Sequence, residues 1–297
     1  MEVVSDFCRC DDLTYDILGM IFTNLPLKEK LTVIPCVCKS SAEAITGPYC
    51  WQEIDIGDWS SCCDPEKLDR MLEMLITRSS GSLKKLCVFE IQTERTFTFI
   101  TENANFLKIL HLIRCNLNDH IVEQICPRLG MISFLDVSYC TKIGAYALEI
   151  IGKNCKMLEG LKRSMHPIDT MGKPLQNDEA YAIASTMPNL KHLGMTYNLM
   201  DTAGVLQIFS NCLKLEILDV RGCWGVKLDK VMVKKSFPNL KIFGPAPEIS
   251  LVYKKIWPGK LGVSVGRVKA CPYSALNVVR VIFLKPDPTL DPELIRP

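Results

Sequence analysis

Several features that mark specialised classes of protein are absent from this 297-residue sequence. Its 35 lysines and arginines nearly balance its 33 aspartates and glutamates, which excludes a strongly basic nucleic-acid-binding domain and an acidic tail protein. No apolar run approaches the roughly 20 residues that a membrane-spanning helix needs. No Asn-x-Ser/Thr glycosylation sequon occurs, and the acidic start does not resemble a signal peptide. We therefore expect neither nucleic acid nor membrane among its partners.

Cysteine, in contrast, is plentiful, with 15 residues, although this share lies below the roughly 8–10% of small disulfide scaffolds. The count is odd, so we expect reduced thiols in a protein of the nucleus, the cytoplasm or both. The close pairs are Cys8 with Cys10, Cys36 with Cys38, and Cys62 with Cys63. None has the Cys-x2–4-Cys spacing of a structural zinc site. The sequence therefore predicts no metal ion and no other cofactor.

An internal repeat dominates the central part of the chain. The pattern Leu-x-x-Leu-x-Leu, or a close variant, recurs with steps of 24, 25, 26, 32, 25 and 25 residues. Its first positions are Leu83, Leu107, Ile132, Leu158, Leu190, Leu215 and Leu240. This period is typical of leucine-rich repeats, in which each unit supplies a short strand followed by a helix and cannot fold without its neighbours. The longest step contains residues 164–177, which we interpret as a loop that bulges out before a helix over 178–186.

Within each unit the leucines point inward, and the residues between them line a concave face. We predict that this face binds a protein substrate through Phe89, His111, Asp136, Ser138, Lys162, Thr196, Asp219 and Arg221. Cys115, Cys140 and Cys223 recur where the chain turns away from the strand, and Asn198 takes the same place in another unit. A small side chain there can face backbone groups inside the turn.

Before the repeats, three short helices are expected over residues 13–25, 27–34 and 37–45. The segment contains Leu13, Asp16-Ile17-Leu18, Ile21-Phe22, Leu25-Pro26, Leu31, Val37-Cys38-Lys39 and Trp51. On these residues it resembles the F-box. The segment departs from the pattern at Thr14, where many members have proline, and at Ser41, where tryptophan is usual.

F-box and repeats together resemble the plant F-box/leucine-rich-repeat proteins. The resemblance implies a substrate-recognition subunit of an SCF (Skp1–cullin–F-box) ubiquitin ligase, which presents target proteins for ubiquitination and proteasomal degradation. It implies a Skp1-type adaptor as partner and, through it, cullin and a RING protein. The adaptor-binding residues would be Leu13, Ile17, Leu18, Ile21, Leu25, Pro26, Leu31 and Val37.

Other functions stay open at this point. The three helices could simply cap the open end of the repeats. The chain could be a small-molecule-dependent hormone co-receptor of the same F-box type, or a scaffold that acts without ubiquitin. An enzyme is not expected, because the Gly-x-Ser-x-Gly match at residues 262–266 has no histidine after it.

The predicted fold class is α/β: a trihelical F-box followed by a short solenoid of about seven units, with parallel strands on the concave face and helices on the convex face. The domain boundaries follow from these patterns. We predict the F-box over 1–55, a linker or capping helix over 56–80, the repeats over 81–247, and a partly disordered tail over 248–297. The linker helix starts at Asp64-Pro65, a good N-cap followed by proline, and should cover the first repeat.

Overall fold

The computed structural model describes residues 13–60, 63–170 and 172–245. The predicted tail over 248–297 lies outside the described residues, as do Cys8 and Cys10. Within the described part of the chain, no helix is both long and apolar enough to cross a membrane.

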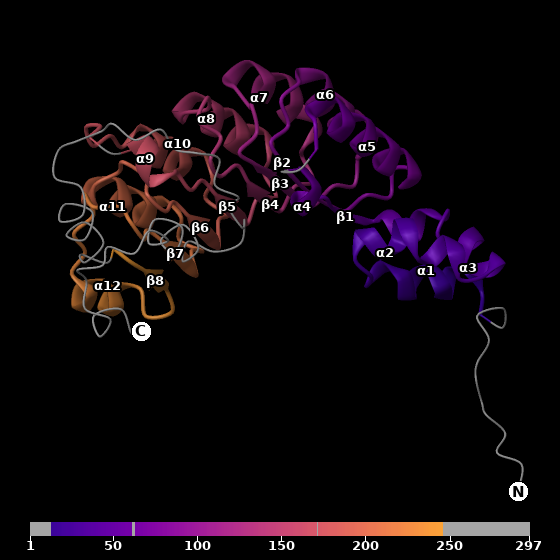
Figure 1. Cartoon of the computed structure of the whole chain (residues 1–297). Coiled ribbons are helices and arrows are strands. Elements are labelled where there is room, and N and C mark those ends of the chain that lie inside the picture. The colour runs from indigo at the N-terminus through magenta and orange to yellow at the C-terminus, as the bar shows by residue number, and fades with distance from the viewer. Residues whose placement is uncertain (1–12, 61–62, 171, 246–297) are drawn as a thin grey trace, which may run out of the picture. The chain divides into compact units, whose positions relative to one another are not determined.

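The N-terminal region has the three predicted helices (Figure 1). They are α1 (Tyr15–Thr23), α2 (Leu27–Thr32) and α3 (Lys39–Ala44), with the 3-10 turns η2 (Ile34–Cys36) and η3 (Pro48–Trp51) beside them. The third helix starts later than predicted because Cys38 is its N-cap, whose Sγ accepts the N–H of Ser41 at 3.3 Å. Ser41 is itself buried, so this position belongs to the core.

Trp51 closes the core of the three helices. Its side chain is fully buried, and its indole N–H donates a hydrogen bond to the carbonyl of Ile45 at 2.8 Å. On the other side, the guanidinium of Arg78 lies 5.3 Å from the centre of the indole ring. Arg78 ends α5 (Pro65–Arg78), the first long helix beyond the F-box segment. Trp51 therefore joins the helical region to the repeats.

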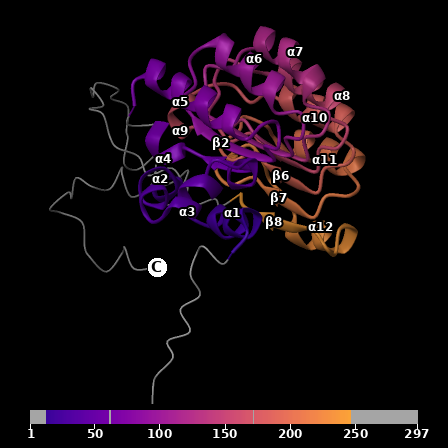
Figure 2. The same cartoon turned by 90° about the vertical axis from the view of Figure 1, so that its right-hand side faces the viewer.

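The repeats form one eight-stranded sheet in which all neighbouring strands are parallel and follow the chain order. Figures 1 and 2 show the strands along the inner side of the curved array and the long helices along its outer side. The strands are β1 (Glu53–Asp55), β2 (Lys85–Phe89), β3 (Ile109–Ile113), β4 (Phe134–Asp136), β5 (Gly160–Lys162), β6 (His192–Gly194), β7 (Ile217–Asp219) and β8 (Lys241–Phe243).

A helix precedes or follows each strand on the convex side. After α5 these are α6 (Glu94–Asn103), α7 (Asp119–Ile125), α8 (Ala145–Asn154), α10 (Asp178–Thr186), α11 (Thr202–Asn211) and α12 (Lys230–Ser236). The short α4 (Gly57–Ser60) precedes α5, and the short η4 (Cys126–Arg128) and α9 (Pro167–Thr170) lie between the later helices. The bounds of α10 are those predicted, and α9 lies within the predicted insertion.

The sheet begins one strand earlier than the repeat pattern indicates. Ile54 in β1 pairs with Leu86 in β2, so the residues from Trp51 to Ile56 make a first unit with tryptophan and isoleucine in place of leucine. The predicted linker helix is α5, which packs against α6 as the helix of this unit. We predicted about seven units, and the sheet has eight strands. The first strand was missed because large apolar residues other than leucine fill its inward positions.

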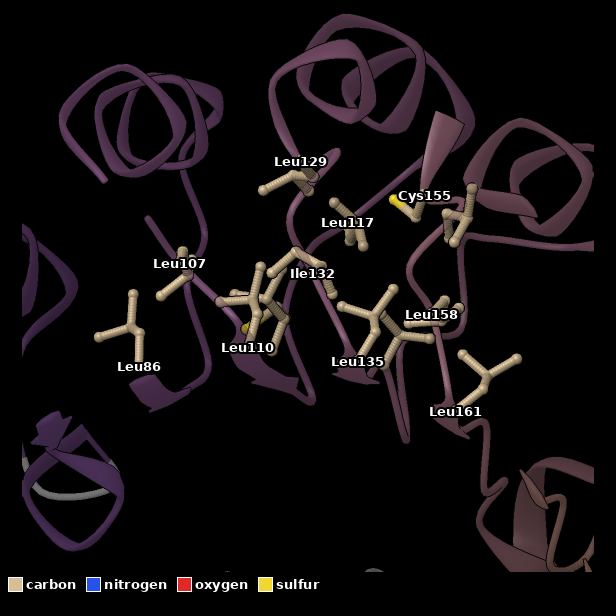
Figure 3. Close-up of a cluster of buried hydrophobic side chains, with 14 of the residues drawn as sticks. Leu86, Leu107, Leu110, Leu117, Leu129, Ile132, Leu135, Cys155, Leu158 and Leu161 are labelled. Atoms are coloured by element: carbon tan, nitrogen blue, oxygen red, sulfur yellow. The ribbon is translucent and has the colours of Figure 1, made fainter. Parts of the chain in front are cut away.

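The core consists of rows of inward side chains, one from each strand. Figure 3 shows Leu86, Leu110, Leu135 and Leu161 side by side, with Leu107, Ile132 and Leu158 beside them. All seven side chains are at most 3% exposed. Because each one contacts its counterparts in the units before and after, the array folds as a whole.

One inward position carries a charge. Arg163 follows β5 at the place where neighbouring units have Val137 and Met195, and it is 1% exposed. Its guanidinium donates to the carbonyls of Cys140 and Ile143 at 3.0 and 2.9 Å, and it pairs with the Glu179 carboxylate at 2.9 Å. Arg163 thus ties the unit that carries the insertion to the turn before it and the helix after it.

The turn cysteines act as predicted. Cys140 Sγ donates to the carbonyl of Leu112 at 3.1 Å, and Cys223 Sγ donates to that of Met195 at 2.9 Å. Burial raises the pKa of the Cys140 thiol to about 11 and that of Cys223 to about 12. Both thiols therefore stay protonated at neutral pH and serve as hydrogen-bond donors inside the turns.

Replacing Arg163 by leucine should lower the free energy of unfolding by about 3–5 kcal/mol, because the buried Glu179 carboxylate loses its counter-ion. Urea denaturation measures the change. The matched control is Arg95→Leu, which breaks the exposed pair with Glu73 and should cost less than about 1 kcal/mol. Equal midpoints for wild type and Arg163→Leu would contradict the role of this pair.

Thiol alkylation tests the turns. At pH 8, iodoacetamide should label the exposed Cys36 and Cys63 in the native protein and leave Cys140 and Cys223 unmodified until urea unfolds the chain. The raised pKa of the two turn thiols keeps the thiolate scarce until the pH approaches 11. Peptide mapping by mass spectrometry gives the labelling of each cysteine. Native labelling of Cys140 as fast as that of Cys36 would refute the assignment.

Candidate interaction surfaces

Six large apolar side chains of the N-terminal helices are exposed to solvent. We call them the N-terminal apolar surface: Tyr15, Ile17, Met20, Ile21, Val33 and Val37, each between 45% and 66% exposed. Exposed apolar side chains that gather on one side of a helix mark a contact surface, because isolated exposed apolar residues are common but clustered ones are costly to expose.

The helical period explains this surface. In α1, Leu18 and Phe22 lie on one face and pack into the core, whereas Ile17 and Ile21 lie one turn apart on the other face. The helix is therefore apolar on two sides, of which the fold itself uses one.

The predicted docking residues divide accordingly. Ile17, Ile21, Pro26 and Val37 are exposed, and Leu13, Leu25 and Leu31 are partly buried. Leu18 is 2% exposed and belongs to the core, so its assignment as a docking residue is wrong. It lies next to Ile17 in the sequence, but a step of one residue rotates a helical side chain by 100°, here from the surface into the core.

The second surface is the concave face of the sheet, where the predicted binding residues also divide. Lys162 and Arg221 are exposed, and His111 and Asp219 are half-buried. Phe89, Asp136, Ser138 and Thr196 are at most 7% exposed, so we correct their assignment as contact residues. Phe89 is covered by Gly57 of α4, and Asp136 lies against His111 of the neighbouring strand β3.

The centre of the concave face is built around Phe134. Its ring lies 5.3 Å from the ring of His111, and the Lys162 ammonium lies 5.8 Å from its centre. Gly160 on the next strand leaves room for this ring, because a Cβ there would come within 2.3 Å of it. The carboxylate of Asp136 sits 3.5 Å from Nδ1 of His111 and accepts the N–H of Ser138. Through these two contacts, Asp136 holds the His111 ring and the backbone at Ser138 in place.

The sequence argument missed a complete row of concave positions. Phe134, Ile109, His192 and Ile217 lie in register two residues before the row of His111. His192 is exposed, and the other three are partly exposed. The alternation of a strand places residues i and i+2 on the same side, so the pattern contained this row. Each residue of this row stands directly before the second leucine of its unit, whereas the predicted binding residues were all chosen after that leucine.

Near the end of the face, Asp219 and Arg221 bind each other. The guanidinium Nε and Nη2 of Arg221 contact the two carboxylate oxygens of Asp219 at 2.9 and 2.6 Å. This bidentate pair satisfies both charges within the chain. In the described part of the chain, no group of three or more His, Cys, Asp and Glu side chains could hold a metal ion.

Comparison with known proteins identifies the helical region. Residues 10–53 match the model of the F-box domain. Over 246 residues the chain is 49% identical to F-box protein FBW2 of Arabidopsis thaliana, an alignment that covers 82% of this chain and 78% of the relative. The chain belongs to the F-box protein family.

Two other relatives of this F-box protein come from the same plant. F-box protein SKIP19 is 29% identical, over 80% of this chain and 78% of its own length. Putative F-box/LRR-repeat protein 23 is 30% identical, over 69% of this chain and 46% of its own length. The similarity to these relatives thus extends far beyond the F-box segment, into the strands and helices of the repeats.

Two residues of the concave face, Asp136 and Arg221, should respond differently to replacement by alanine. Asp136→Ala leaves the buried N–H of Ser138 without its acceptor and should cost about 1–3 kcal/mol in the free energy of unfolding. Arg221→Ala breaks a partly exposed pair, in which the Arg221 side chain is 47% exposed, and should cost less than about 1 kcal/mol. Urea denaturation of both variants measures the difference, and the reverse order would contradict the structural role of Asp136.

Proposed function

We propose that this F-box protein is the substrate-recognition subunit of an SCF ubiquitin ligase. In this proposal the N-terminal apolar surface binds a Skp1-type adaptor, and through it cullin and a RING protein. The concave face of the repeats binds the protein to be ubiquitinated and degraded. The chain carries out no catalytic step itself, and it acts in the nucleus, the cytoplasm or both.

The observation that carries the proposal is the exposure of the N-terminal apolar surface. A simple cap for the repeats would bury its apolar residues against them. Trp51 and Arg78 make such a contact on one side of the helical region. Ile17, Ile21 and Val37 do not, because they remain 45–56% exposed in the presence of the repeats. Capping of the repeats therefore explains why Trp51 is buried, but it does not explain the exposed Ile17, Ile21 and Val37. Docking of an adaptor would cover these three side chains.

The concave face supports the other half of the proposal. Its centre offers an aromatic ring, an imidazole and a lysine on closely spaced strands, a surface suited to a protein partner. Because this surface and the N-terminal apolar surface lie on separate groups of elements, both partners can bind at once.

The adaptor contact is tested by co-purification of the full chain with a recombinant Skp1-type adaptor. Ile17→Asp and Ile21→Asp should each weaken binding by about 30-fold or more, since each places a charge in the centre of an apolar interface. Isothermal titration calorimetry gives the affinities.

Met131→Asp is the matched control, because Met131 is 50% exposed in the repeats and its replacement introduces the same charge elsewhere. It should bind the adaptor as wild type does. Unfolding curves show that the variants are folded. Adaptor affinity unchanged in Ile17→Asp and Ile21→Asp would refute docking through this surface.

A further inference from the structure

Directly after the strands, the chain adopts a left-handed backbone conformation in most units. The φ angles are 61° at Glu90, 55° at Arg114, 63° at Tyr139 and 55° at Tyr197, and Gly222 takes this place in one further unit, with a φ of 75°. The N–H groups here continue the ladder of the sheet: that of Arg114 donates to the carbonyl of Ser138, and that of Tyr139 to the carbonyl of Ser164. In these units the turn after the strand therefore uses this conformation.

Glycine adopts a positive φ without strain, whereas a residue with a Cβ does not. One unit uses glycine here, at Gly222, so the larger residues in the other units need an explanation. Tyr197 has a structural one: its ring is buried and packs over Gly222. Glu90, Arg114 and Tyr139 are partly or well exposed, so core packing does not account for them. Strained residues kept for their side chains are typical of functional sites.

Two of these side chains, Arg114 and Tyr139, line a cavity, and the third, Glu90, pairs with Arg114. Arg114 Nη1 pairs with Glu90 Oε1 at 3.3 Å, and the Arg114 guanidinium lies 6.0 Å from the centre of the Tyr139 ring. The Tyr139 ring in turn lies 6.4 Å from that of His166. The cavity has a volume of about 430 Å³, within the range of small-ligand sites. It is lined by residues of four successive units.

The lining is rich in hydrogen-bond donors. Arg114 uses one of its N–H groups for Glu90 and leaves the others available. Lys142 also lines the cavity, and in the described residues no carboxylate lies within ion-pair distance of its ammonium. Asn116 adds an amide, and Asp169 is the one carboxylate of the lining. Donors thus outnumber acceptors in the lining. Its two cations, Arg114 and Lys142, lie on the turns of neighbouring units.

We propose that this cavity binds an oxyanion, a phosphate or carboxylate group, held by Arg114 and Lys142. The group is carried either by a small molecule or by a side chain of the protein bound at the adjoining concave face. Glu90 holds the guanidinium in place, and Tyr139 supports its flat face. This inference does not depend on binding of an adaptor.

Arg114→Gly tests the proposal, since glycine suits the backbone at this position. The probes are inorganic pyrophosphate and degenerate peptide libraries with a fixed central phosphoserine, glutamate or serine, each titrated into the full chain. Wild type should bind pyrophosphate, or bind the phosphoserine or glutamate library more tightly than the serine library. Arg114→Gly should weaken that binding by roughly tenfold or more, because a charge-assisted contact is lost.

The matched control is Arg128→Ala, since Arg128 is equally exposed and pairs with Glu102 at 3.4 Å, away from the cavity. It should bind like wild type. Arg114→Gly should melt no lower than this control. Binding of pyrophosphate alone identifies a free anion as the ligand, and preference for an anionic library identifies a side chain. The proposal fails if neither probe binds wild type, if Arg114→Gly binds as wild type does, or if it melts far below Arg128→Ala.

Discussion

The structure depends on one row of aliphatic side chains, contributed in register by all eight strands: Ile54, Leu86, Leu110, Leu135, Leu161, Leu193, Leu218 and Ile242. Burying a leucine side chain stabilises the fold by roughly 1.5–3 kcal/mol, but only when the units on both sides are present to cover it. Every unit must therefore align its strand with the last one, and this alignment fixes which side chains reach the concave face and which enter the core. The composition of the concave face therefore depends on how the row of aliphatic side chains is aligned.

Two departures from the repeat pattern show how the array accommodates variation. Arg163 replaces an aliphatic residue, and its charge is balanced by Glu179 and two backbone carbonyls. This arrangement lies where the longest unit inserts its extra residues, so a polar network takes over where the apolar repeat is interrupted. The left-handed turns are a second departure. Where the unit needs no side chain, glycine fills the turn, and where it holds Arg114 or Tyr139, the chain accepts backbone strain.

The two proposed binding surfaces differ in chemistry for a physical reason. The N-terminal helices are too few to bury all their apolar residues among themselves, so Ile17 and Ile21 stay exposed. The sheet buries its leucines on the helix side and can present polar and aromatic groups on the other. An apolar surface suits a lasting contact such as that with an adaptor, and a mixed surface suits recognition of a particular protein.

The amino-acid sequence by itself determined the trihelical segment, the period of the repeats, the turn cysteines and the bounds of α10, because all of these depend on local spacing of apolar and turn residues. It did not reveal the first strand, where Trp51 and Ile54 stand for leucines, or the burial of Leu18, Phe89 and Asp136. The burial of a residue is decided by what other elements place against it: Gly57 of α4 against Phe89, and His111 of β3 against Asp136. The cavity beside Arg114 likewise needed the tertiary structure, because its lining residues come from four units that only the register of the sheet places together.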